Sequence, residues 1–237
     1  ISVASWIKTH NDQSYHDGIG DATRRVLDIY TPAGTAPVDG WPIMMFVHGG
    51  AFYDGDEEDI GAPGGTKYMA DTLGAGFAVV SVSYKLTDGN IILNTNVGWT
   101  HPAPAQDVLC AAKYVVDNAE TPGLDGRAVA ISGYSAGGHI VLEAALAAQD
   151  ANRDTYDMVW RGPNTTQNRY TEYPNLDMTQ GRTGIPTFIG LASWAGPVML
   201  SDTYEHNPII PPFINIYYGR YPNSTYSPGA VDYEADL

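Results

Sequence analysis

Residues 126–149, GRAVAISGYSAGGHIVLEAALAAQ, are the stretch from which the rest of the chain can be interpreted. A short apolar run enters a tight Gly-x-Ser-x-Gly turn centred on Ser135, and good helix formers follow from His139. The order predicts a strand, a sharp turn and a helix. Because Gly133 and Gly137 lack a Cβ, the strand and the helix can approach closely while the Ser135 hydroxyl stays exposed on a strained turn.

Ser135 is the candidate nucleophile. The chain contains 26 glycines, so the five-residue pattern alone is a weak signal. The alternative is a glycine-rich turn whose serine only caps the following helix. The sequence around the turn has to distinguish the two interpretations.

Composition excludes several classes of protein. The net charge of −15 and the absence of a basic patch argue against binding to nucleic acid. No apolar run reaches 18 residues, so no membrane span is predicted. The single cysteine, Cys110, excludes a disulfide within the chain and is expected to be a buried, inert thiol. Residues 1–237 are interpreted as one domain, because no linker-like stretch interrupts them.

Strands and helices are expected to alternate along the first two thirds of the chain. This order predicts an α/β fold, a mostly parallel sheet with helices on both faces. Continuous apolar runs are typical of strands buried on both faces of such a sheet. Strands are expected near 25–30, 42–47, 77–84, 128–131 and 186–194, and helices near 66–73, 104–118 and 139–149.

Two glycine-rich turns follow two of these strands directly. His48-Gly49-Gly50 comes after the strand at 42–47, and the turn at 133–137 comes after the strand at 128–131. The carboxyl ends of parallel strands share one edge of the sheet, where catalytic groups of open α/β folds gather. The two turns are therefore predicted to lie close together.

A serine hydroxyl needs help to act as a nucleophile at neutral pH. It requires a histidine base, a carboxylate that orients the base, and hydrogen-bond donors for the developing oxyanion. The backbone N–H groups of Gly50, Ala51 and Ala136 are the predicted oxyanion donors. His48 is expected to orient its loop through a backbone hydrogen bond rather than to act as the base.

The last third of the chain is less regular. Residues 150–184 are polar and lack periodicity, and a stretch of this length is interpreted as a cap or lid-like insertion. After the strand ending near Trp194, the chain is rich in proline, tyrosine and glycine. Residues 213–218 fit a further strand or a helix equally well.

Four segments carry a family resemblance: LDIYTP (27–32), VHGGAF (47–52), VSYKL (82–86) with HPAPAQDV (101–108), and GYSAGGH (133–139). Taken together, they resemble the α/β-hydrolases of the hormone-sensitive-lipase, type-B carboxylesterase and feruloyl/acetyl-xylan esterase group. The resemblance covers about residues 25–150 and implies an α/β-hydrolase fold. It also implies ester hydrolysis through an acyl-enzyme on Ser135.

The same resemblance places the catalytic acid and the histidine base after the nucleophile, on the last two strands of the fold. Those C-terminal strands are expected to be missing from this chain, and a second polypeptide or a lost segment is expected to supply them. Within the chain, His206 is the alternative base, with Asp202 or Asp232 as the carboxylate. His139 is too close in sequence to Ser135 to face it as a base.

Further expectations concern cofactors, processing and the competing function. No Cys/His cluster has the spacing of metal ligands and no phosphate loop is present, so neither a metal nor a cofactor is predicted. Sequons at Asn164 and Asn223 favour a secreted glycoprotein. The expected binding partner is a small-molecule ester substrate. The competing hypothesis is a non-catalytic hydrolase-fold protein that binds a ligand.

Overall fold

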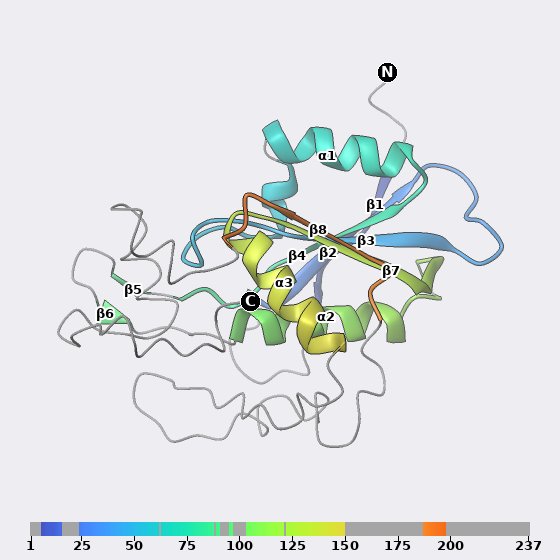
Figure 1. The fold of residues 1–237 in the computed structure, drawn as a ribbon. Helices are drawn as coiled ribbons and strands as arrows, with labels where there is room; N and C mark the ends of the chain where they lie inside the picture. The colour runs from blue at the N-terminus through green and yellow to red at the C-terminus, as the bar shows by residue number, and fades with distance from the viewer. Residues whose placement is uncertain are drawn as a thin grey trace.

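A computed structural model describes residues 6–15, 24–61, 63–87, 89–90, 95–96, 103–120, 122–149 and 187–197. Six of the described strands form one sheet in the order β1-β2-β4-β3-β7-β8, and β5 and β6 form a separate small hairpin (Figure 1). The strands are β1 (Trp6–Ser14), β2 (Val26–Pro32), β3 (Trp41–Val47), β4 (Ala78–Val82), β5 (Gly89–Asn90), β6 (Thr95–Asn96), β7 (Leu124–Tyr134) and β8 (Gly190–Trp194).

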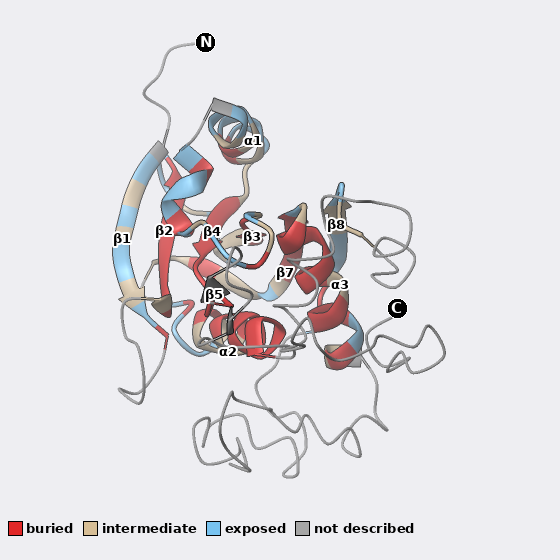
Figure 2. Ribbon diagram, turned by 90° about the vertical axis from the view of Figure 1, so that its left-hand side faces the viewer, coloured by how far each residue is buried: buried red, intermediate tan, exposed pale blue. Residues whose placement is uncertain are grey.

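Helices cover both faces of the sheet. Helix α1 (Pro63–Gly74) lies on one face, while α2 (Ala103–Asp117) and α3 (Ala136–Gln149) lie side by side on the other (Figure 1). A short 3-10 helix, η2 (Glu57–Gly61), precedes α1. Strands β2 and β4 are buried along their whole length, whereas residues of β1 and β8 at the two sheet edges are largely exposed (Figure 2). This layering confirms the predicted α/β fold, a mostly parallel sheet with helices on both faces.

The register of the sheet brings three chain segments to one edge. Strands β4, β3, β7 and β8 are parallel, β2 pairs antiparallel with β4, and β1 pairs antiparallel with β2. Val47, the last residue of β3, pairs with Val82 of β4 and with Gly133 of β7. The residues that follow these three strands therefore begin at the same level of the sheet.

The predicted elements are present, with differences at their ends. Strand β7 begins at Leu124 rather than 128, because Trp41 of β3 pairs with Leu124 before a register shift. Helix α3 begins at Ala136 rather than at His139, and α1 begins at Pro63 rather than at 66. Strand β8 begins at 190 rather than 186.

Several sequence predictions fall outside the described residues. These are the insertion at 150–184, the sequons at Asn164 and Asn223, and the side chains of Asp202, His206 and Asp232. They stay predictions, as does the single-domain interpretation. Among the described helices, none has the length and apolar character needed to span a membrane.

Candidate active site

The turn between β7 and α3 has the strained geometry that its glycines suggested. Ser135 has a φ of 54°, a left-handed conformation that residues with a side chain rarely adopt. A Cβ on Gly133 would lie 2.2 Å from the Gly137 carbonyl oxygen, and a Cβ on Gly137 would lie 2.2 Å from the Val47 carbonyl oxygen. Only glycine fits at either position without moving the backbone.

Backbone hydrogen bonds hold the strained serine in place. The Ser135 amide donates to the carbonyl oxygen of Trp194 on β8 at 2.8 Å, and the Ser135 carbonyl accepts from the His139 amide at 3.2 Å. The side chain is half-buried, while that of Tyr134 beside it is exposed. Ser135 is therefore fixed by its own backbone and still reachable from solvent.

The loop after β3 passes directly beside this serine. A Cβ built on Gly49 would lie 3.3 Å from the Cβ of Ser135. Gly50, Ala51 and Phe52 all have positive φ, at 95°, 53° and 65°. The turn closes where the amides of Tyr53 and Asp54 donate to the Gly50 carbonyl oxygen, both at 2.9 Å. We call residues 49–52 the glycine loop.

The three predicted oxyanion donors lie on these two turns. Ala136 is the first residue of α3, so its N–H has no acceptor within the helix. The N–H groups of Gly50 and Ala51 donate none of the backbone hydrogen bonds found in the described loops. The structure thus brings the glycine loop and Ser135 together. Whether the three N–H groups bind an oxyanion stays a prediction.

His48 is buried beneath the glycine loop, with only 1% of its surface exposed. Its Nδ1 donates to the Gly49 carbonyl oxygen at 2.8 Å, and its ring stacks on Tyr84 with 4.3 Å between centroids. The expected loop-orienting role requires a hydrogen bond from the side chain to the backbone of the loop, and the bond to Gly49 is of this kind. Burial lowers the pKa of His48, against the opposing effects of the Gly49 hydrogen bond and of Asp59.

The depressed pKa of His48 makes stability depend on pH. The unfolded chain takes up a proton at this side chain near pH 6.5, whereas the native protein does so only at lower pH. The free energy of unfolding should therefore fall as pH drops below about 6.5, by at most about 1.4 kcal/mol per pH unit from this residue. Urea unfolding at pH 7, 6 and 5 should show a flatter profile for His48→Asn than for the wild type. Parallel profiles would contradict this assignment.

His139 has both ring nitrogens engaged. Nδ1 lies 2.7 Å from the Pro197 carbonyl oxygen, and Nε2 lies 3.2 Å from Oε1 of Glu143, one turn further along α3. The ring is buried and meets Phe52 of the glycine loop edge-on, with 5.9 Å between centroids. His139 therefore supports the loop and the segment after β8, and it is not positioned as a free base.

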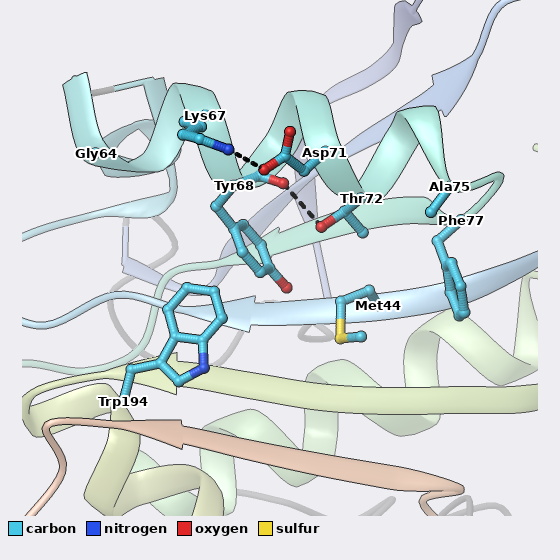
Figure 3. A pocket seen from close by; sticks show the side chains of 9 residues that line it. All are labelled: Met44, Gly64, Lys67, Tyr68, Asp71, Thr72, Ala75, Phe77 and Trp194. Atoms are coloured by element: carbon cyan, nitrogen blue, oxygen red, sulfur yellow. Dashed lines mark hydrogen bonds and ion pairs between the residues drawn. The ribbon is translucent and has the colours of Figure 1, made fainter.

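A groove of about 540 Å³ lies between α1 and the sheet, and the sequence did not predict it (Figure 3). Tyr68 and Trp194 lie close together at one end, with 4.8 Å between their rings. The Tyr68 hydroxyl is 2.7 Å from Oγ of Ser132 on β7. The carbonyl of Trp194 accepts the Ser135 amide, so this residue connects the groove to the turn. The lining residues are Met44, Gly64, Lys67, Tyr68, Asp71, Thr72, Ala75, Phe77 and Trp194.

The described residues contain one group of carboxylates compact enough to consider as a metal site. Asp12, Asp28 and Glu57 have oxygen atoms within 4.8 Å of one another. These oxygens already have protein partners, because Lys8 and the Tyr30 hydroxyl bind Asp28 and the Ser83 hydroxyl donates to Glu57. The group is therefore not assigned as a metal site.

Comparisons with known proteins identify a family and several similar hydrolases. The family model BD-FAE matches residues 27–179. An AB hydrolase superfamily protein of Schizosaccharomyces pombe is 33% identical over 126 residues, which cover 52% of this chain and 33% of that protein. Carboxylesterase NlhH of Mycobacterium tuberculosis is 29% identical over 227 residues, covering 82% of this chain and 63% of that one. The chain thus spans about a third to just under two thirds of these relatives.

Solved structures show the same fold. Esterase B from Lactobacillus rhamnosis superposes with a TM-score of 0.61 at 18% identity, over 90% of this chain and 56% of that chain. A bifunctional GH43-CE protein of Bacteroides eggerthii gives 0.65 at 21% identity, over 98% of this chain and 28% of the other. Because the BD-FAE family model matches more than half of the chain, the chain belongs to the BD-FAE family and has the α/β-hydrolase fold.

Proposed function

We propose that this chain is the larger part of a serine carboxylesterase, which hydrolyses a small ester through an acyl-enzyme on Ser135. The observation that carries the proposal is the left-handed Ser135, held between β7 and α3 with the glycine loop against it. A helix cap needs neither this strain nor a neighbouring loop with three positive φ angles. The carboxylesterase names of relatives support an ester rather than an amide as the substrate.

The chemistry assigns a role to each group. The Ser135 hydroxyl oxygen attacks the ester carbonyl carbon while a histidine base takes its proton. The N–H groups of Gly50, Ala51 and Ala136 stabilise the negative charge on the carbonyl oxygen. The leaving alcohol departs with that proton, and a water molecule, deprotonated by the same base, releases the acid from Ser135. His48 orients the loop that carries two of the donors.

The base is proposed to come from outside the described residues. Three histidines are described: His10 lies on β1 at the sheet edge opposite β8, His48 is bonded to Gly49, and His139 is held between Pro197 and Glu143. Nε2 of His48 is also buried and has no hydrogen-bond partner, so His48 is not bonded to the Ser135 hydroxyl. We propose that a second polypeptide or a further segment of the same precursor supplies the base and its acid. His206 is the alternative within this chain.

The test is to label the native preparation with a fluorophosphonate and to record a denaturing mass spectrum of every polypeptide in it. We expect an adduct on this chain and a second, smaller polypeptide. A fully active preparation that contains this chain alone would refute the second polypeptide and direct attention to His206. An ester-hydrolysing preparation that takes up no label would refute the serine mechanism.

A further inference from the structure

The five residues after β4, Ser83 to Thr87, are all buried although they form no helix or strand. Its first and its middle residue are anchored to the body of the fold. The Ser83 amide donates to the Val26 carbonyl oxygen at 3.0 Å. The Lys85 amide donates to the buried carboxylate of Asp107 on α2 at 2.8 Å. The segment is therefore a rigid support whose remaining side chains are held in fixed directions.

Two of those side chains donate hydrogen bonds to backbone carbonyls of the glycine loop and of His48, which directly precedes it. The Tyr84 hydroxyl donates to the carbonyl oxygens of Gly49 at 3.1 Å and of His48 at 3.2 Å. At the other end of the loop, Thr87 donates twice to the Phe52 carbonyl oxygen, from its amide and from its hydroxyl, each at 2.8 Å. Both side chains are fully buried. Burial also raises the pKa of Tyr84, so its phenol keeps its proton and stays a donor.

These contacts lie on both sides of the strained part of the loop. Ala51 and Phe52 are not glycines, yet both have positive φ. Residues hold such conformations only where the surrounding structure determines them. On the far side, the Phe52 ring packs against His139 of α3. Tyr84 and Thr87 fix the carbonyl groups on either side of the two candidate donors, Gly50 and Ala51.

We propose that Tyr84 and Thr87 are positioning residues, which hold the glycine loop in the conformation that aims the N–H groups of Gly50 and Ala51. Their effect on the reaction rests on the proposed function, whereas their effect on the loop does not. Oxyanion donors act on charge that develops only in the transition state, and small displacements of them are costly. Loosening the loop should therefore lower kcat while leaving KM nearly unchanged.

The experiment compares Thr87→Val, Tyr84→Phe and the double variant with the wild type. Each variant is prepared in the same way as the native protein. Thr87→Val removes the hydroxyl and keeps the shape and the amide, and Thr87→Ser keeps the hydroxyl. Thr9→Val is the matched control, because on β1 it removes a hydroxyl that donates to the Ile29 backbone carbonyl at 3.1 Å, and β2 and β4 separate β1 from β3 and the loop. The first measurement is hydrogen exchange at the amides of Tyr53 and Asp54, whose bonds to Gly50 close the turn. The second is kcat and KM for an aryl acetate.

We expect exchange at Tyr53 and Asp54 to be at least tenfold faster in the double variant. We expect kcat to fall about tenfold in each single variant and about a hundredfold in the double variant. Thr87→Ser should restore the wild-type values, and Thr9→Val should match the wild type in both measurements.

Unchanged exchange in the double variant would overturn the proposal, and so would accelerated exchange with kcat within twofold of the wild type. If the wild type hydrolyses no ester, the proposed function fails, and the exchange measurement alone decides whether Tyr84 and Thr87 hold the loop.

Discussion

Replacing Ser135 with alanine should lower kcat for p-nitrophenyl acetate by on the order of 10⁴ to 10⁶, because the proposed acyl-enzyme forms on the hydroxyl that this change removes. The fold should survive the change. Serine and alanine both carry a Cβ, so the strain at a φ of 54° is the same, and the two backbone hydrogen bonds of residue 135 do not involve its side chain. Steady-state kinetics and thermal unfolding of the two proteins provide the measurement.

Ser132→Ala is the matched control for this variant. Ser132 lies on the same strand, but its hydroxyl contacts Tyr68 and the Met45 carbonyl oxygen. Losing these bonds should cost about 1 kcal/mol of stability and leave kcat unchanged. If Ser135→Ala retained a tenth of the wild-type rate, Ser135 would not be the nucleophile. A wild type that binds esters without hydrolysing them would instead favour a non-catalytic binding protein.

Gly137→Ala should destabilise the fold by about 3 kcal/mol or more, the upper end of what overpacking costs. The new Cβ would lie 2.2 Å from the Val47 carbonyl oxygen and 2.3 Å from that of His48. Both atoms are backbone at the end of β3, so relief requires moving α3, β3 or the glycine loop. Urea unfolding measures the loss.

Gly64→Ala provides the contrast within the same chain. Gly64 lies in the first turn of α1, and apart from its chain neighbours and the backbone of its own helix no atom lies within 4 Å of the position its Cβ would take. The free energy of unfolding should stay the same or rise by up to about 1 kcal/mol, because alanine favours helix. A Gly137→Ala protein within 1 kcal/mol of the wild type would contradict the close approach of α3 to the end of β3.

The sequence predicted the core of the fold because that core is built from local patterns. Residues 42–47 are continuously apolar and form β3, which is buried in the middle of the sheet. The glycines around Ser135 indicated a close approach that the structure shows as clashes for any larger residue. The alternation of strands and helices then predicted that the two glycine-rich turns follow strands at the same edge of the sheet, where Val47 pairs with Gly133.

Segments whose structure depends on distant partners could not be predicted. Strand β1 is polar and exposed, with irregular pairing and a positive φ at Asp12, so no apolar pattern marks it. Asp125 and Arg127 interrupt the apolar run of β7, but Leu124 still pairs with Trp41 across the sheet. The contact of Thr87 with Phe52 joins residues 35 positions apart, and nothing local to either residue signals it.

The most direct test of the central claim is to map the fluorophosphonate adduct on the labelled chain by peptide mass spectrometry. Our account predicts a single adduct, on the peptide that contains Ser135, and its complete loss in Ser135→Ala. An adduct on another residue, or one that persists in Ser135→Ala, would show that the turn between β7 and α3 does not supply the nucleophile.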